Sequence, residues 1–368
     1  MAMCGFRSRH VGIMAERMGQ DVFMVSHPAA SIRDVAERAG VALGTVSNVL
    51  NRPERVADAT RLRVLDAIAE LGFVRNDAAR QLRAGKSRTV GLVVLDVRNP
   101  FFTDVGRGAE ERAFEAGLSV LLGNSDNEAE RESAYVALFE EQRVKGLLIS
   151  PIGDVYARLE RLRLRGTPTV LVDRCAEGRA FSSVSVDDVA GGELAVSHLI
   201  SQGCTRIAYV AGPLNIQQVA DRLQGANQAV AAEPGVQLEV LSSPGLSVQT
   251  GRKLGETILE RPAESRPDGV FAANDLLAVG LLQAFSMLNT IRVPQDIALI
   301  GYDDIDFASA TVVPLSSIRQ PSNLIGRTGV ELLLKEVSAA EAGEELTHQQ
   351  VVFQPELVVR DSSRRRSP

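Results

Sequence analysis

Polar and aromatic side chains directly follow several of the apolar runs in this 368-residue chain. Short apolar runs of this kind are typical of buried parallel strands, and ligands of such sheets bind outside the carboxyl ends of the strands. The residues at these ends are Asn99, Phe101, Phe102, Asp173, Arg174, Asn274, Asp275, Asp303 and Asp304. Their donors and acceptors suit a ligand rich in hydroxyl groups, so the pattern predicts a small-molecule site.

A second set of polar residues is predicted to lie on one face of a short helix near the N-terminus. The stretch 31–51 has the pattern of two helices joined by a tight turn, with Ser31 as the first N-cap and Gly40 at the end of the first helix. The apolar face of the first helix consists of Ile32, Val35, Ala36 and Ala39. The polar face of the second carries Thr45, Ser47, Asn48 and Asn51. This arrangement is typical of a DNA-reading helix-turn-helix.

A third helix is expected to complete this N-terminal head, with Asp58 as its N-cap and Gly72 at its end. The apolar residues expected to cover the first two helices are Leu62, Leu65, Ile68, Ala69 and Leu71. The following segment 76–82 is helix-prone but shorter than a helix that persists alone in water. Residues 83–88 are predicted to form a basic linker.

From Thr89 onward, predicted strands and helices alternate in two series. The first series has strands at 90–97, 120–126, 146–152 and 168–173, with helices at 104–116, 128–142 and 155–164. After a strand at 184–187, the second series has helices at 191–201, 221–231, 248–259 and 276–288, with strands at 206–212, 237–241, 269–275 and 297–304. Two such series predict an α/β fold with two doubly wound parallel sheets.

Composition and charge restrict the class of protein. A hydrophobic fraction of 45% with 23% charged residues is typical of a globular protein, and no apolar run approaches the roughly 20 residues that span a bilayer. The three cysteines and four histidines are scattered, so no disulfide framework, metal site or cofactor is expected, and the cytoplasm is the expected location.

Residues 31–88 carry eleven Lys and Arg against seven Asp and Glu, a net charge of +4, whereas the whole chain carries −6. A basic head on an acidic body fits local binding of DNA phosphates.

Several motifs together resemble those of the LacI/GalR family of bacterial transcription regulators. The first two are highly specific: IRDVAERAGV-x3-TVSNVLN and VADATRLRVLDAIAELGFVRNDAARQLRAGKS. The others are VGLVV-x4-NPFF, VDR, RIAYVAGP, DRLQG, ANDLLAVG, IALIGYDD and PELVVRDS, so the resemblance covers 31–362. It implies a homodimer that binds pseudo-palindromic operator DNA, in which a helix-turn-helix head precedes a two-lobed sensor similar to periplasmic sugar-binding proteins.

The resemblance implies DNA contacts by Leu43, Gly44, Thr45, Ser47, Asn48, Asn51, Asn76, Ala79 and Leu82. Three of the base-reading positions are unusual for the family. Leu43 offers only apolar contacts, Gly44 has no side chain to offer, and Asn48 stands where many members carry Arg and favours adenine. In a hinge helix that folds on DNA, Leu82 is expected to wedge into the central minor groove.

The resemblance also implies a ribose-type effector site made of Asn99, Phe101, Phe102, Asp173, Arg174, Arg222, Asn274, Asp303 and Gln320. Phenyl rings stack on apolar sugar faces, while amide, carboxylate and guanidinium groups bind hydroxyls. Leu246 lies where relatives often present another stacking aromatic ring. The expected effector is therefore a small carbohydrate, with a pentose such as ribose favoured.

The expected domains are an N-terminal extension at 1–30, a head at 31–75, a hinge helix and linker at 76–88, a sensor at 89–360 and a tail at 361–368. The extension is expected to be disordered or untranslated, with an internal functional start. The N-lobe of the sensor is expected at 89–186 and 318–345, and the C-lobe at 187–317 and 346–360. The chain is expected to cross between lobes near 186–188, 317–320 and 346–350. Closure on a ligand would then change the geometry of the dimer and its hinge helices.

Two other classes share parts of this pattern. A free sugar-binding protein of a transport system would share everything after Thr89, but the head and the absence of a signal-peptide pattern argue against it. An α/β enzyme is disfavoured because the chain has no phosphate-binding GxxxxGK[ST] loop and no GxSxG elbow. The glycines of Gly106-Arg107-Gly108 lie within a predicted helix rather than before one.

Overall fold

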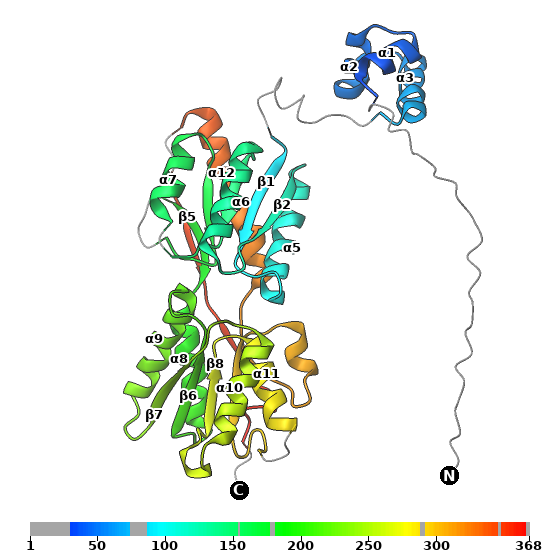
Figure 1. Cartoon of the computed structure of the whole chain (residues 1–368). Helices are drawn as coiled ribbons and strands as arrows, with labels where there is room; N and C mark the ends of the chain where they lie inside the picture. Colours follow the sequence, from blue (N-terminus) through cyan, green and yellow to red (C-terminus); the bar gives the residue numbers. More distant parts are fainter. Residues whose placement is uncertain are drawn as a thin grey trace, which may run out of the picture. The chain divides into compact units, whose positions relative to one another are not determined.

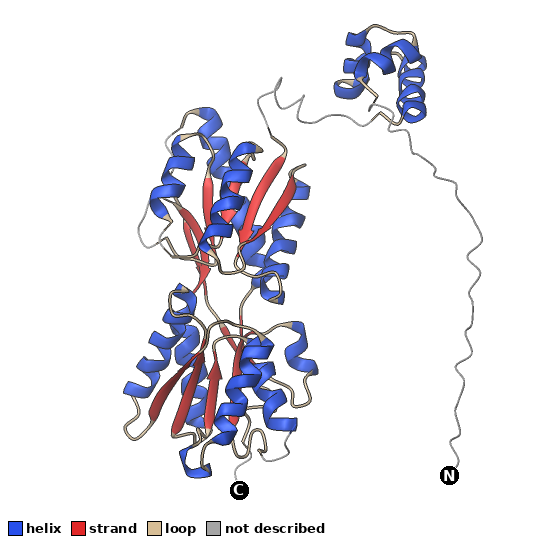
Figure 2. Ribbon diagram, in the orientation of Figure 1, coloured by secondary structure: helices blue, strands red, loops and turns tan. Residues whose placement is uncertain are grey.

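The computed structural model divides into two compact units, Met1–Gly85 and Lys86–Pro368, and we describe each by itself (Figures 1 and 2). The structure describes residues 30–73, 87–153, 155–176, 181–287, 291–344 and 347–365. Residues 1–29 of the expected extension at 1–30, and the expected hinge helix with Asn76, Ala79 and Leu82, lie outside the described residues.

The first unit is a small helical head. Its elements are α1 (Ile32–Ala39), α2 (Leu43–Asn51), the short 3₁₀ helix η1 (Pro53–Arg55) and α3 (Asp58–Leu71). At the start of α1 the hydroxyl of Ser31 accepts from the backbone N–H of Asp34, while the carboxylate of Asp34 accepts from the backbone N–H of Ser31. Gly40 ends α1 at a φ of 65°. Both predicted ends of this helix are therefore confirmed.

The core of the head differs from the expected one at α3. The buried residues of this helix are Val64 and Ala67, whereas Leu62 and Leu65 are 57% and 45% exposed. These buried residues pack with Val35, Ala36, Ala39, Val46 and Val49. Of the expected residues, Ile68 and Leu71 do pack against this core, whereas Leu62, Leu65 and Ala69 are exposed, because the pattern favoured the larger leucines over Val64 and Ala67. Asp58 is the first helical residue rather than the N-cap, a place taken by Ala57.

The second unit contains two six-stranded sheets, one in each lobe. The N-lobe sheet has the order β11-β5-β4-β3-β1-β2, and all its neighbouring strands are parallel. Its strands are β1 (Thr89–Val94), β2 (Ser119–Asn124), β3 (Gly146–Ile149), β4 (Thr169–Val172), β5 (Ser182–Val186) and β11 (Gln350–Phe353). The helices of this lobe are α5 (Pro100–Glu115), α6 (Ala129–Glu141), α7 (Tyr156–Leu164) and α12 (Ser322–Ala342).

Helices cover both faces of the N-lobe sheet. Leu92 packs in one cluster with residues of α5 and α12, while its neighbour Val93 packs in another with residues of α6 and α7. Because alternate side chains of a strand point to opposite faces, a sheet covered on both faces needs continuous apolar runs. This explains why the strands could be recognised in the sequence.

The C-lobe sheet has the order β12-β10-β9-β8-β6-β7. Its strands are β6 (Arg206–Ala211), β7 (Gln237–Ser242), β8 (Gly269–Ala272), β9 (Ala298–Asp303), β10 (Ser316–Arg319) and β12 (Glu356–Val358). Its longer helices are α8 (Asp188–Ser201), α9 (Gln217–Ala231), α10 (Val248–Glu260) and α11 (Asp275–Met287), with the short helices η2 (Ala263–Ser265) and η3 (Asp306–Ala310). The strands are parallel except β12, which runs antiparallel to β10. The expected fold of two doubly wound sheets is confirmed, with one antiparallel edge strand.

Three segments join the lobes in Figure 1, and one lies later in the chain than expected. The first crossing follows β5 at Asp187, and the second follows β10 at Gln320 and Pro321. The third was expected at 346–350, but β11 pairs with β5 in the N-lobe and β12 pairs with β10 in the C-lobe. The crossing therefore lies at Gln354 and Pro355, and residues 350–353 belong to the N-lobe. The prediction missed β11 because its alternating burial lacks the continuous apolar pattern of the central strands.

Glycines allow three pairs of helices in the sensor to approach closely. A Cβ on Gly108 of α5 would lie 2.0 Å from the carbonyl oxygen of Asn323 in α12. Equivalent backbone contacts occur at Gly225, between α9 and α8, and at Gly251, between α10 and α11.

No helix within the described ranges is long and apolar enough to span a membrane.

Candidate functional site

The structure brings predicted ligand-binding residues of both lobes into direct contact. Asn99 is the N-cap of α5 in the N-lobe, and Asp303 ends β9 in the C-lobe. The Nδ2 of Asn99 donates to Oδ2 of Asp303 at 2.8 Å, and the Nε2 of Gln320 donates to Oδ1 of the same carboxylate at 2.7 Å. Asp303 therefore joins the N-lobe to the second crossing segment.

A second contact between the lobes involves a residue that the sequence did not single out. The Nε2 of Gln218, on α9, donates to the Oδ2 of Asp173 at 2.7 Å and to its carbonyl oxygen. Both side chains are buried. Gln218 lies four residues before Arg222, and residues at this spacing share a helix face. This spacing was the signal that could have identified Gln218.

Arg222 is the central cation of the C-lobe side of the site. Its Nε donates to Oδ1 of Asp188 at 2.7 Å, its Nη1 donates to the carbonyl oxygen of Ala273 at 2.6 Å, and its guanidinium carbon lies 3.5 Å from the ring centroid of Tyr302. Arg222 and Asp188 are 5% and 6% exposed. A buried charge needs such partners, and these contacts fix the position of the Arg222 guanidinium group.

The remaining predicted residues have more varied surroundings. Phe101 and Phe102 are buried, with edge-to-face rings 5.0 Å apart, and they belong to the N-lobe core as well as to the predicted site. The amide of Asn274 accepts from the N–H of Leu277 and donates to the carbonyl oxygen of Leu246, so it also caps α11. Arg174 follows Asp173 and is half-buried.

Three of the predicted ligand-binding residues have buried polar atoms without a hydrogen-bond partner. These atoms are Oδ1 of Asp173, Nε of Arg174 and Oε1 of Gln320. Buried polar atoms are nearly always paired in folded proteins, and the exceptions call for an explanation. These two unpaired acceptors and one unpaired donor match a ligand that both donates and accepts hydrogen bonds, such as a polyol.

The backbone at the strand ends is also unusual. Asp173, Asp303 and Asp304 adopt positive φ values of 59°, 106° and 53°. Non-glycine residues rarely adopt this conformation, and they do so mainly where the surrounding structure imposes it, as at binding sites.

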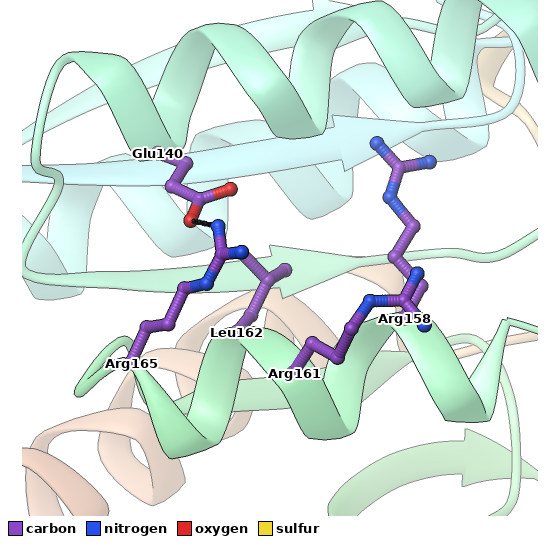
Figure 3. A pocket seen from close by; sticks show the side chains of 5 residues that line it. All are labelled: Glu140, Arg158, Arg161, Leu162 and Arg165. Atoms are coloured by element: carbon purple, nitrogen blue, oxygen red, sulfur yellow. Dashed lines mark hydrogen bonds and ion pairs between the residues drawn. The ribbon is translucent and has the colours of Figure 1, made fainter.

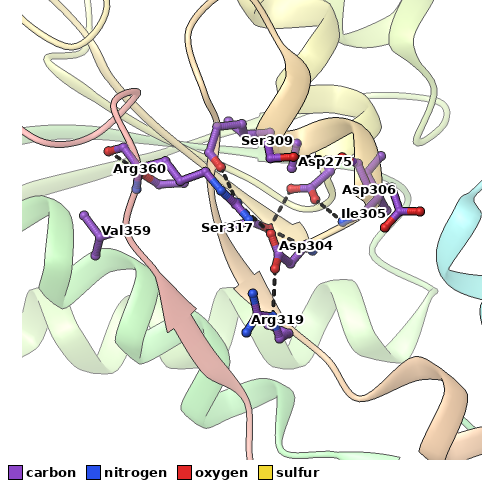
Figure 4. A network of polar contacts seen from close by, with 12 residues as sticks. Asp275, Asp304, Ile305, Asp306, Ser309, Ser317, Arg319, Val359 and Arg360 are labelled. Atoms are coloured by element: carbon purple, nitrogen blue, oxygen red, sulfur yellow. Dashed lines mark hydrogen bonds and ion pairs between the residues drawn. The ribbon is translucent and has the colours of Figure 1, made fainter.

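A buried polar network supports the C-lobe side of the site (Figure 4). Asp275 accepts from the hydroxyl of Ser317 at 2.7 Å and from the N–H of Ile305 at 2.9 Å. The carboxylate of Asp304 accepts from Arg319 at 2.8 Å and from Arg360 at 2.6 Å. The acids at the strand ends therefore have two different roles. Asp303 contacts the other lobe, whereas Asp275 and Asp304 hold the loop between β9 and η3.

Burial shifts the ionisation of the site's acids. Desolvation raises the pKa of Asp303 to about 6, although Arg222, Asn99 and Gln320 favour its charged form. Burial and the nearby charge of Asp188 raise the pKa of Asp173 well above its usual value. The carboxyl groups of the site therefore hold protons at a higher pH than carboxyl groups in water do.

We expect Asp303 to make stability depend on pH. Its pKa rises from 3.8 in the unfolded chain to about 6 on folding, so the folded protein binds more protons between these values. The free energy of unfolding should fall as pH rises through this window and then level off. Urea denaturation of wild type and Asp303→Asn between pH 4 and pH 7 measures the effect. The free energy of unfolding of Asp303→Asn should depend less steeply on pH than that of wild type. Asp66→Asn, at an exposed position of α3, should keep the wild-type dependence. An identical slope in Asp303→Asn and wild type would contradict the assignment.

The predicted DNA-reading residues of α2 lie on its accessible side. Leu43, Gly44, Asn48 and Asn51 are exposed, whereas Thr45 and Ser47 are half-buried. The Nδ2 of Asn51 donates to the carbonyl oxygen of Ser47 at 2.8 Å. The opposite side of α2 buries Val46 and Val49 in the core of the head.

In the described ranges, no group of three or more His, Cys, Asp or Glu side chains could hold a metal ion.

Comparison with known proteins matches both units. Residues 31–76 match the family described as "Bacterial regulatory proteins, lacI family", and residues 196–363 match the "Periplasmic binding protein-like domain". The "Ribose operon repressor" of Bacillus subtilis (strain 168) is 35% identical over 306 residues, which cover 83% of this chain and 91% of that protein.

Two further relatives cover more of the chain. The "HTH-type transcriptional repressor PurR" of Aliivibrio fischeri (strain MJ11) is 32% identical over 338 residues, which cover 90% of this chain and 98% of that protein. A crystal structure of the lac repressor dimer bound to operator and the anti-inducer ONPF matches with a TM-score of 0.78 and 28% identity, covering 91% of this chain and 99% of that one.

Proposed function

The chain belongs to the LacI family of bacterial regulatory proteins, and on that premise we propose that it is a repressor of sugar-uptake or catabolism genes, controlled by a pentose such as ribose. The single observation that best supports a polyol effector is the set of unpaired buried atoms on Asp173, Arg174 and Gln320. The ribose operon repressor among its relatives favours a pentose. As a DNA-binding regulator it acts in the cytoplasm.

In the proposed complex, the effector lies between the lobes and replaces the direct contacts of Asn99 with Asp303 and of Asp173 with Gln218. Carboxylates accept from sugar hydroxyls, while Arg222 and the amide side chains donate to hydroxyl oxygens. Phe101 and Phe102 present apolar surface to the sugar ring. The remaining proposed binding residues are Arg174, Asn274 and Gln320.

We propose that the homodimer reads a pseudo-palindromic operator through α2 of each head. Thr45, Ser47 and Asn51 contact phosphates or flanking bases, and Leu43 and Asn48 contact base edges in the major groove. Gly44 leaves room for close approach of the backbone, since no atom lies within 4 Å of a Cβ placed there. Because a leucine and a glycine open this helix, the operator should differ from those of relatives with polar residues at these positions.

A thermal-shift screen with pentoses, hexoses, nucleobases and amino acids tests the effector class. A pentose should raise the melting temperature, because a ligand that binds only the folded state stabilises it. The same pentose should change operator affinity in a gel-shift assay. Stabilisation by nucleobases or amino acids alone would contradict the proposal.

Leu82 provides a separate test of the proposed operator contact. Its replacement by alanine should weaken specific operator binding, since a smaller side chain cannot hold the central base step open. We expect at least a tenfold loss, or about 1.4 kcal/mol, in fluorescence anisotropy with labelled operator. Pentose binding and dimer formation should stay unchanged. Equal operator affinity of variant and wild type would rule out the minor-groove role.

A further inference from the structure

The N-lobe contains a cavity on the sheet face covered by α6 and α7, separate from the proposed effector site. It has a volume of about 110 Å³ and is lined by Glu140, Arg158, Arg161, Leu162 and Arg165 (Figure 3). A single water needs about 10–15 Å³ on the same measure, so the cavity can hold a larger polar group. Glu140 comes from α6, while the other lining residues lie on α7 or directly after it.

The lining of this cavity is strongly basic, with three guanidinium groups and one carboxylate. Arg165 pairs with Glu140. Arg158 donates to the hydroxyl of Ser133 at 2.6 Å and to its carbonyl oxygen, so two neutral acceptors fix its position. The nearby carboxyl group of Glu132 is buried, accepts from the N–H of Ile152, and has a pKa raised by desolvation.

Arg161 is the cation that these contacts leave uncompensated. Its charge lies close enough to Arg158 to lower the pKa of that residue, after the larger effects of burial, which lowers this pKa, and of the Glu132 carboxylate, which raises it. No hydrogen bond or ion pair of the Arg161 side chain occurs within the described part of the chain. By contrast, Arg163 on the same helix pairs with Glu160 at 2.6 Å and lies outside the cavity lining. Two adjacent cations in a concave site favour an anion between them.

We propose that this cavity between α6 and α7 binds a phosphate group, held by Arg161 together with Arg158 and Arg165. The planar guanidinium group presents paired N–H donors that match the oxygens of a phosphate. The buried side chain of Leu162 forms the apolar floor. The ligand is free inorganic phosphate or the phosphate group of a small metabolite, and this site is distinct from the proposed effector site around Arg222.

Isothermal titration of the full chain tests the site with inorganic phosphate and with glycerol 3-phosphate, at constant ionic strength and pH 7.5. Both arms measure the same anion site, and tighter binding of the ester identifies a metabolite as the preferred source. Arg161→Ala should weaken binding about tenfold or more, because a charge-assisted contact is lost. Arg163→Ala serves as the matched control on the same helix and should bind as wild type does.

Three results would overturn the proposal. The first is that wild type binds neither probe, whether the ligand is at 20-fold the protein concentration or at about 50 mM. This range covers weak anion sites. The second is an equal loss in Arg161→Ala and Arg163→Ala, which would indicate a general charge effect. The third is loss of phosphate binding in Arg222→Ala with retention in Arg161→Ala, which would place the anion in the effector cleft. Since Arg161 is exposed, its replacement should leave folding and pentose response intact.

Discussion

Replacing Arg222 with alanine should abolish the response to the effector and destabilise the sensor by about 3–5 kcal/mol. The guanidinium group is buried, pairs with Asp188 and lies over the ring of Tyr302. Its removal leaves the carboxylate of Asp188 buried without its partner, and this desolvated charge accounts for most of the expected loss. Urea denaturation and effector titration measure the two effects.

Two further variants separate the effect on binding from the effect on stability. Arg252→Ala removes an exposed ion pair with Glu256 and should change stability by less than about 1 kcal/mol. The double variant Arg222→Met with Asp188→Asn removes both buried charges and should regain part of the stability. Effector binding should stay lost in the double variant. A fully responsive Arg222→Ala protein would show that this cation does not contact the ligand.

Gly108→Ala should destabilise the N-lobe by about 2–3 kcal/mol through overpacking. The added Cβ would lie 2.0 Å from the carbonyl oxygen of Asn323 and 2.8 Å from its carbonyl carbon. Both atoms belong to the backbone of α12, so no side chain can rotate away. The helices α5 and α12 would have to separate, which would also loosen their packing on the sheet. Chemical denaturation of the full chain measures the loss.

Gly106→Ala is the matched control for this prediction. Gly106 lies in the same helix, and the nearest atom to a Cβ there is Cδ2 of Leu92 at 3.9 Å, an ordinary contact. Because alanine favours a helix over glycine by about 1 kcal/mol, this variant should be neutral or more stable than wild type. Equal destabilisation by both substitutions would show that the close approach of α5 and α12 does not cause the loss of stability in Gly108→Ala.

Much of the fold could be predicted because both sensor sheets are covered by helices on their two faces. Central strands such as β1 and β8 must then be apolar throughout, and this pattern is local in the sequence. The edge strands β11 and β12 are half-exposed and short, so they left no comparable pattern. The third lobe crossing was misplaced for this reason.

In the head, the caps of α1 could be predicted because they depend on residues within a few positions of one another. The inward face of α3 could be predicted only in part, since the choice between Leu65 and Val64 depends on how α3 crosses α1 and α2. Helix packing of this kind is a tertiary property, and two adjacent faces of α3 are both apolar enough to be buried.

The sequence alone determined the family, the two doubly wound sheets and the residues at the strand ends, because each depends on local patterns or motifs. Only the tertiary structure decided how those residues combine. It pairs Asn99 with Asp303 across 204 positions of sequence, adds Gln218 as the partner of Asp173, and pairs Asp304 with Arg319 rather than with the other lobe. Hydrogen-bond partners far apart in the chain are set by the packing of the lobes, and no local pattern encodes that geometry.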